Sequence, residues 1–427
     1  MNNLNFLDKK YLQNTFSNVT NISEKKLKKI LELLTYIEKE NCIGDTTTYS
    51  PTNNVYDEIK EIDFTKRSTL SIVYIVKNEA CQIQNSLKKS MLCADEIIIL
   101  DTGSTDHTID LIKKINSEKI KIYSKRWEND FSKARNQANQ YATSDWILTL
   151  DADETIDFNI NIFRELLNYL NNFPILKDYV FQIKLVGPKK IFFAGRLIKN
   201  SNTFFYKGKV HETYSHKLKK DNFESIKLDF QILYKERQSL EKQNYYNELL
   251  IETQKIYPND QRWTYFYVRD NFKKLTSKSI EQLTDNYLFT MPITFSSLKI
   301  DKYTHGLLVL RLTKYLEENQ LNKFKEYFDI SQTFFESIDL IYLKFLYKIY
   351  GISMQQNKLL EEFLMDYEQL PNKQEFYNID YIDSIFADLL LKNDYISEAK
   401  IIYTDLYKKN DELPCFQQNI IKSILKK

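Results

Sequence analysis

The sequence predicts an α/β domain with a mostly parallel sheet, followed by an all-α domain. Between residues 70 and 150, short apolar runs alternate with stretches of helical length, which is typical of parallel strands joined by crossover helices. After residue 238 the strand signals fade and helical stripes follow one another. We expect a helical extension and linker over residues 1–66, the α/β domain over 67–235 and the helical domain over 236–427.

Each strand of the α/β domain is expected from a run of apolar residues. The parallel strands are expected at residues 70–76, 96–100, 120–123 and 146–150. Helices are expected between them and after them at residues 80–91, 105–115, 131–141 and 160–171. Residues 179–185, 190–198 and 203–207 alternate like antiparallel strands, and residues 226–233 predict one more strand.

Two regions outside the α/β domain have helical periodicity. Residues 23–40 form an amphipathic stripe with Ser23 as N-cap, and residues 42–66 read as a polar linker. The stripe is expected to pack on a later domain or on a second subunit. The helical half has stripes at residues 239–257, 262–275, 280–289, 303–318, 321–335, 340–350, 358–367, 379–391, 396–408 and 416–425. These pairs resemble a degenerate tetratricopeptide-like array, and an irregular helical bundle is the alternative.

Composition excludes several classes of protein. The 427 residues carry 60 Lys and Arg against 58 Asp and Glu, a balance that argues against a dedicated nucleic-acid binder. No apolar run approaches the length of a membrane span, and residues 1–11 contain no signal-peptide core. The four cysteines lack zinc-site spacing, so a reducing bacterial cytoplasm is the expected location.

The most informative stretch is D-W-I-L-T-L-D-A-D-E, residues 145–154. Asp151 and Asp153 follow a buried strand, and ligands of open α/β sheets bind beyond the carboxyl ends of the strands. Two carboxylates in this position suit Mg²⁺ or Mn²⁺, which is held by one or two carboxylates together with substrate phosphates. A D-x-D alone is weak evidence, because short acidic loops also arise by chance.

A second polar segment, D-T-G-S-T-D, follows the strand at residues 96–100. Asp101 can accept hydrogen bonds from a uracil or a ribose, Gly103 permits a tight turn, and Ser104 or Thr105 can cap the next helix. Taken alone, this segment is explained more simply by an ordinary turn with a helix cap. In the same way, Glu79 could be a solvated strand end, and Arg135 a surface residue of its helix.

Together these segments are far more specific than each is alone. The order N-E, D-x-G-S-T-D, F-S-x-A-R-N, D-A-D-E resembles family 2 glycosyltransferases of the GT-A fold, and G-K-V-H-E at residues 208–212 occurs in a subset of them. The resemblance implies a nucleotide-sugar donor, a divalent metal ion and inversion at the anomeric carbon. It assigns the donor site to Val76, Glu79, Asp101, Ser104, Arg135, Asp151 and Ala152. Asp153 would be the direct metal ligand.

The layout of the whole chain resembles a narrower group, the glycocin S-glycosyltransferases of the sublancin and thurandacin type. These enzymes transfer a hexose to a cysteine, sometimes a serine, of a bacteriocin precursor peptide. The resemblance implies UDP-glucose as the first donor to consider, a peptide acceptor held by the helical half, and a homodimer through helical regions as one possible assembly.

His211 and Glu212 are the candidates for the acceptor base. A thiol with a pKa near 8.5 needs less help from a base than a serine hydroxyl does. His211 is also a candidate metal ligand, and a structural His-Glu pair is the alternative for both residues. Glu154 is expected either near the acceptor or as a helix-entry acid, while His107 and His305 are expected to be structural.

Two rival functions remain at this stage. An enzyme of the same fold could act on a cell-surface polysaccharide or a lipid-linked glycan, which would call for a membrane-facing surface. A helical-repeat binding protein with a catalytically silent GT-A domain is the second rival, and the intact D-x-D weighs against it.

Overall fold

The computed structural model of the chain divides into two compact units, Met1–Leu249 and Leu250–Lys427. Each unit has its own hydrophobic core. The structure describes residues 7–16, 23–38, 59–219, 223–235, 240–288, 302–332, 337–351, 356–370, 377, 379–393 and 395–409. The domain boundaries expected at residues 66/67 and 235/236 stay predictions.

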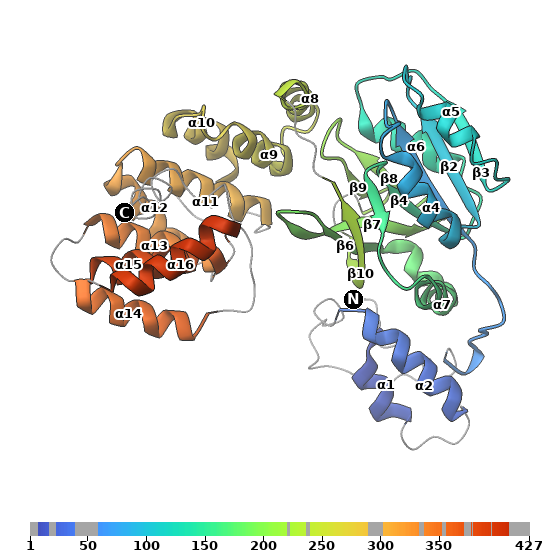
Figure 1. The fold of residues 1–427 in the computed structure, drawn as a ribbon, viewed down its shortest axis with the longest axis horizontal. Coiled ribbons are helices and arrows are strands. Elements are labelled where there is room, and N and C mark those ends of the chain that lie inside the picture. Colours follow the sequence, from blue (N-terminus) through green and yellow to red (C-terminus); the bar gives the residue numbers. More distant parts are fainter. Residues whose placement is uncertain are drawn as a thin grey trace. The chain divides into compact units, whose positions relative to one another are not determined.

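The first unit is built on a mixed eight-stranded sheet with the order β3-β2-β1-β4-β7-β6-β10-β5 (Figure 1). Its strands are β1 (Leu70–Val76), β2 (Glu96–Asp101), β3 (Ile120–Ser124), β4 (Trp146–Leu150), β5 (Glu154–Ile156), β6 (Val180–Val186), β7 (Ile191–Lys199) and β10 (Ser225–Tyr234). Strands β1 to β4 pair in parallel, and β7 runs antiparallel to both β4 and β6. The expected strands are confirmed. Strand β5 was missed, because three residues are too short to show a periodic pattern.

Alternate side chains of the parallel strands enter two different cores. Ile72 and Tyr74 of β1 point into the core that includes residues of α4 (Ile83–Cys93), α5 (Thr108–Lys113) and α7 (Ile160–Asn171). Val73, between them, belongs to the core that includes residues of α6 (Phe131–Gln140). The sheet is therefore covered on both faces, which explains why β1, β2 and β4 are almost wholly apolar.

A small hairpin lies on the same face of the sheet as α6. It consists of β8 (Phe204–Lys207) and β9 (Thr213–His216), which pair antiparallel. Asn136 of α6 fixes it through two hydrogen bonds with the backbone of Tyr206, at 2.8 and 2.7 Å. The connecting loop contains the G-K-V-H-E segment and therefore comes to lie beside α6.

The N-terminal helices belong to the first unit. They are α1 (Lys9–Phe16), α2 (Glu24–Leu33) and the 3₁₀ turn η2 (Leu34–Tyr36). Ser23 accepts a hydrogen bond from the Lys26 amide, which confirms it as the N-cap of α2. Ile30 joins the main core, and Lys29 pairs with Glu165 of α7 at 3.0 Å. Helix α2 thus packs on the α/β domain. Residues 42–58 of the expected linker lie outside the described residues.

The second unit is a run of helices, as expected from the sequence. Helix α8 (Leu240–Ile256) begins in the first unit and ends in the second. The following helices are α9 (Gln261–Asn271), α10 (Ser277–Leu288), α11 (Lys302–Glu317), α12 (Leu321–Ser331), α13 (Ile338–Gly351), α14 (Gln356–Glu368), α15 (Ile379–Lys392) and α16 (Ile396–Lys409). The expected helix at residues 416–425 lies outside the described residues.

Alternate helices of this unit contact one another. Helix α11 packs on α9 and α13, α13 packs on α15, and the even-numbered helices attach to this row (Figure 1). Such stacking of helix pairs is the arrangement of tetratricopeptide-like arrays. Of the helices that the structure describes, none is both long enough and apolar enough to span a bilayer.

Candidate active site at the sheet edge

Three strand ends meet at one edge of the sheet of the first unit. Val76 of β1 pairs with Asp101 of β2, and Tyr74 of β1 pairs with Leu150, the residue before Asp151. Because β2 and β4 flank β1, Asp101 and Asp151 lie two strand spacings apart, about 10 Å. The expected placement of both carboxylates at one sheet edge is confirmed.

The D-A-D-E segment forms a tight turn between β4 and β5. The Glu154 amide donates to the Asp151 carbonyl at 3.0 Å, and the Asp151 amide donates to Oε2 of Glu154 at 2.9 Å. Ala152, at the centre of the turn, is buried. Glu154 begins β5 and is 3% exposed, so its interpretation as a helix-entry acid was wrong. It closes the turn instead.

Two buried arginines bind the Asp151 carboxylate. Nη2 of Arg135 donates to its Oδ1 at 2.7 Å, and Nη2 of Arg196 donates to its Oδ2 at 3.2 Å. Burial alone would raise the pKa of Asp151, but the two guanidinium groups hold it well below its usual range. Asp151 is therefore an ionised anchor whose two oxygens are both engaged.

Asp153 is in a different electrostatic position. Burial, together with the charge of Asp151, raises its pKa. No described side chain forms an ion pair with it, and the nearest backbone link is Lys235, whose amide donates to the Asp153 carbonyl at 3.3 Å. The charges of Lys242 and Arg196 offset this rise in pKa only in part. A carboxylate that is disfavoured in its charged form and has no ion-pair partner among the described residues is suited to a metal ion. Within the described residues, no three His, Cys, Asp or Glu side chains converge on one point.

Arg135 also connects the D-x-D turn to the G-K-V-H-E loop. Its side chain is 5% exposed, so it is not a surface residue of α6, and its Nε donates to Oε1 of Glu212. The loop bends sharply, because Gly208 and His211 have φ values of +93° and +49°. A positive φ is uncommon for histidine, and such backbone strain clusters at functional sites. His211 and Glu212 thus lie at the same edge as the D-x-D turn.

The two loops assigned to the nucleoside are held together by polar side chains. Ser104 accepts from the Asn78 amide at 3.0 Å, and its own amide donates to Asp101 at 3.0 Å. The Glu79 amide donates to Thr108, and Val76 accepts hydrogen bonds through its carbonyl from Thr102. The structure thus brings Val76, Glu79, Asp101 and Ser104 into one rim beside the D-x-D turn. Their roles stay predictions.

Two further residues at this edge were missed from the sequence. Arg196 lies in an apolar antiparallel strand, where no motif distinguishes it. Tyr246 lies on α8 and meets His211 edge to face, with 6.2 Å between ring centroids. Burial and the neighbouring charges of Glu212 and Asp151 raise the pKa of Tyr246. The F-S-x-A-R-N motif is a partial signal for Tyr246, because the ring of Phe131 in this motif lies against the ring of Tyr246, with 5.7 Å between the ring centroids.

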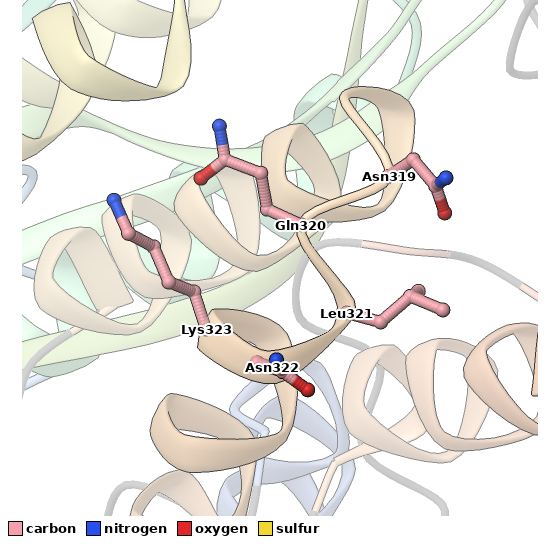
Figure 2. Close-up of a pocket in the computed structure, with 5 residues that line it drawn as sticks. All are labelled: Asn319, Gln320, Leu321, Asn322 and Lys323. Carbon is pink, nitrogen blue, oxygen red and sulfur yellow. The ribbon is translucent and has the colours of Figure 1, made fainter.

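A surface hollow in the second unit has no comparable chemistry. Figure 2 shows that it is lined by the turn between α11 and α12, residues Asn319, Gln320, Leu321, Asn322 and Lys323. Lys323 pairs with Glu281 at 2.7 Å, and Gln320 donates to Ser277 at 2.9 Å. These contacts hold neighbouring helices together, so the candidate active site is the sheet edge.

The sheet and its edge define the class of protein. A parallel β-α-β half continued by antiparallel strands, with a D-x-D turn beyond the carboxyl ends of the strands, is the GT-A arrangement. The model of the family described as Glycosyl transferase family 2 matches residues 71–175, which contain the D-x-D turn and Arg135. The first unit therefore contains a region, residues 71–175, that is similar to family 2 glycosyltransferases.

The similar proteins match different lengths of this chain. It is 28% identical over 325 residues to the SPbeta prophage-derived glycosyltransferase SunS of Bacillus subtilis (strain 168), which covers 70% of this chain and 74% of SunS. It is 42% identical over 87 residues to a TPR repeat-containing protein of Synechococcus elongatus, 20% of this chain and 21% of that protein. Among solved structures, S. aureus TarS 1-349 in complex with UDP-GlcNAc aligns with 62% of this chain and 92% of its own, at 13% identity and a TM-score of 0.34.

Proposed function

We propose that the protein is a metal-dependent inverting glycosyltransferase. It moves a hexose from a UDP-sugar, UDP-glucose first, to a cysteine of a bacteriocin precursor peptide, with serine as a second acceptor. One observation carries the proposal. Asp153 lies at the proposed donor edge, without an ion-pair partner among the described residues, next to an Asp151 that two arginines bind.

The donor set at this edge fits Mg²⁺ or Mn²⁺. Asp153 would hold the ion, and Asp151 and His211, at the same edge of the sheet, are the further candidates for its surroundings. Such ions take few protein ligands and complete their coordination with phosphate oxygens and water, which agrees with the lack of a three-ligand cluster in the described part of the chain. When bound, the ion offsets the negative charge that the diphosphate acquires as it leaves.

The chain's own residues would bind and orient the donor. Asp101 can accept from the uracil imide or a ribose hydroxyl, because its Oδ1 accepts only one loop amide, that of Ser104. Val76 and Glu79 complete the rim on the nucleoside side. Asp151, fixed by its two arginines, is placed beside the ribose and the metal ion.

In the transfer step the acceptor sulfur attacks the anomeric carbon. The sulfur–carbon bond forms while the bond from that carbon to the phosphate oxygen breaks, and UDP leaves with the bonding electron pair. The thiol proton passes to a base, for which His211 and Glu212 are the candidates. Attack from the face opposite to the diphosphate inverts the anomeric configuration.

The peptide acceptor rests on similarity rather than on the site itself. The order of motifs and the helical second half resemble glycocin S-glycosyltransferases, and the similarity to SunS over 325 residues supports the same assignment. The helical unit would hold the peptide, since helical arrays commonly bind peptides. A cytoplasmic location and a homodimer through helical regions belong to this proposal.

Mass spectrometry tests the proposed transfer reaction. A cysteine-containing precursor peptide is incubated with the protein, UDP-glucose and Mn²⁺, and its mass is measured. The expected result is a hexose-sized mass increase that disappears with EDTA and with a Cys→Ala peptide. Metal-dependent release of UDP without any peptide product would retain the donor assignment and indicate that the acceptor is a glycan. No reaction with any UDP-hexose, with or without acceptor, would contradict the proposal.

A further inference from the structure

Arg196 occupies an irregular position in the sheet. Strand β7 pairs with β6 through Phe181 with Leu197 and through Gln182 with Gly195, so Arg196 is an extra residue that has no partner in β6. This is a β-bulge, a feature that commonly directs a side chain toward an active site. The adjacent Gly195 is sterically required, because an added Cβ would lie 2.7 Å from a methyl group of Val180.

The bulge places the Arg196 guanidinium between Asp151, the first acid of the D-x-D, and Glu154, which closes the turn. Nη2 donates to Asp151 at 3.2 Å and also to Oε1 of Glu154. The Arg196 side chain is 12% exposed and that of Glu154 is 3% exposed, so water cannot replace these contacts freely. The second oxygen of Glu154 accepts the Asp151 amide at 2.9 Å.

These contacts fix both the side chain and the backbone of Asp151. Arg196 and Arg135 bind its two carboxylate oxygens, while Glu154, itself held by Arg196, binds its amide. Asp153 is two residues further along the same turn. The direction in which its carboxylate points therefore depends on a turn that Arg196 fixes through these contacts. Arg196 belongs to β7, a strand outside the residues 71–175 that match the family model.

A purely stabilising role is a poor explanation for this arrangement. Buried ion pairs contribute little to stability on average, because the loss of hydration offsets the attraction between the charges. Among the described residues, the buried Nε of Arg196 also finds no hydrogen-bond partner, which adds a cost. A well-packed apolar residue at the bulge would satisfy stability better, whereas a fixed D-x-D geometry requires the charges.

We propose that Arg196 is a positioning residue, which acts with Glu154 to hold the D-x-D turn so that Asp153 meets the metal–diphosphate group. The inference rests on the proposed function, because it assumes that the turn binds a divalent cation together with UDP. It assigns to Arg196 an effect on cation affinity that goes beyond its effect on folding.

Electron paramagnetic resonance of Mn²⁺ with UDP measures that effect without requiring turnover. We expect Arg196→Met to weaken UDP-dependent Mn²⁺ binding by about tenfold or more, as is usual when a partner behind a metal ligand is removed. The control is Arg164→Met. Arg164 is also buried, and it donates to the Ser68 carbonyl and, at 2.7 Å, to Asp95, away from the D-x-D turn. Its loss should leave Mn²⁺ affinity within about twofold.

Two further variants separate positioning from folding. Arg196→Met with Glu154→Gln removes the buried unpaired charge, so thermal stability should recover while Mn²⁺ affinity stays low. Arg196→Lys keeps the positive charge but not the planar set of N–H donors of the guanidinium group. We expect this variant to fold and to bind Mn²⁺ several-fold more weakly than the unaltered protein.

Each outcome is decisive. If Arg196→Met, or Arg196→Lys should the former not fold, binds Mn²⁺ as tightly as Arg164→Met, the positioning role is overturned. Recovery of Mn²⁺ affinity together with stability in the double variant would also overturn it, since the role would then be structural. If the unaltered protein shows no UDP-dependent Mn²⁺ binding, the proposed function fails and this inference fails with it.

Discussion

The charges around the D-x-D turn of the first unit form one connected chain, whereas two buried side chains of the second unit, His305 and Arg311, form local pairs. At the sheet edge, Glu212, Arg135, Asp151, Arg196 and Glu154 alternate in sign and touch in that order. In the helical unit, His305 of α11 meets Asp339 of α13 at 2.8 Å, and Arg311 of α11 meets Asp285 of α10 at 2.6 Å. Each of these pairs connects two neighbouring helices.

This difference shows that buried charged side chains have two different roles in the two units. A local pair between two helices selects one packing of those helices over others. A connected chain brings charged groups from several elements to one point, where the pKa of Asp151 is lowered by its two arginines and the pKa of Glu154 is raised by burial. Perturbed carboxylates of this kind, at the carboxyl edge of a sheet, are typical of an active site.

The largest effect is expected from removing Arg135 from this chain of charges. Arg135→Met leaves Asp151 and Glu212 without their shared cation, so it should cost the first unit about 3–5 kcal/mol of unfolding free energy and abolish turnover. Arg311→Met is the matched change in the second unit. Its partner Asp285 has a side chain that is 55% exposed and can return to water, so the loss should be smaller and turnover should persist. Denaturant unfolding measures both, and equal losses would contradict the comparison.

A buried acid of the second unit should make that unit sensitive to pH. Burial raises the pKa of Asp388 to about 6, although Tyr403 donates to it. Between pH 4 and 6 the folded chain keeps a proton that an unfolded aspartic acid, with a pKa near 3.9, has released. The unfolding free energy should therefore fall as pH rises through this window, by about 3 kcal/mol in total.

Asp388→Asn should remove most of this pH dependence, which thermal unfolding at pH 4 and pH 7 would measure. Asp405→Asn, on the exposed side of α16 where the Asp405 side chain is 58% exposed, is the control and should leave the dependence unchanged. An unaltered slope in Asp388→Asn would show that another group titrates.

The acceptor base can be distinguished by comparing two acceptors. If His211 is the base, His211→Ala should slow transfer to serine by about 100-fold and transfer to cysteine by less, because a thiol ionises more easily. Initial rates with matched Cys and Ser peptides measure this ratio. Equal losses would point to a metal or structural role for His211.

The smallest effect is expected from two neighbouring tyrosines on α8. Tyr245 accepts from Trp127 at 2.7 Å and donates to Asn129 at 2.7 Å, so Tyr245→Phe should cost about 1 kcal/mol. Tyr246 meets His211 through its ring, and Tyr246→Phe keeps that ring, so its stability should change by less than about 0.5 kcal/mol. Thermal unfolding of both variants tests this, and a larger loss in Tyr246→Phe would reveal a structural hydroxyl.

The sequence predicts the parallel half of the sheet well, because its strands are continuous apolar runs between helices. It also places Asp101 and Asp151 at one edge, since both residues directly follow such runs. It could not show that Arg135 is buried against Glu212, because their contact joins residues 77 positions apart. Arg196 leaves no signal at all, since the bulge that directs it depends on how β6 and β7 pair.

The helical array also explains why no fixed repeat period could be recognised in the sequence. The alternate helices α9, α11, α13 and α15 begin at unequal intervals, so no fixed period is visible even though the helices stack in one row. Their packing is set by aromatic contacts such as Phe324 with Tyr347, whose ring centroids are 4.9 Å apart. Such contacts are specified by shape and leave no motif.

Isothermal calorimetry of UDP binding, with and without Mn²⁺, tests the central claim most directly when wild type is compared with Asp153→Ala. The site predicts that UDP binds wild type tightly only with Mn²⁺ present, and that Asp153→Ala loses this Mn²⁺-dependent part. The variant should keep its thermal transition, because Asp153 has no ion-pair partner among the described residues and its charge is disfavoured by burial. Mn²⁺-dependent binding that is equally tight in Asp153→Ala would contradict the assignment of the D-x-D turn as the metal–diphosphate site.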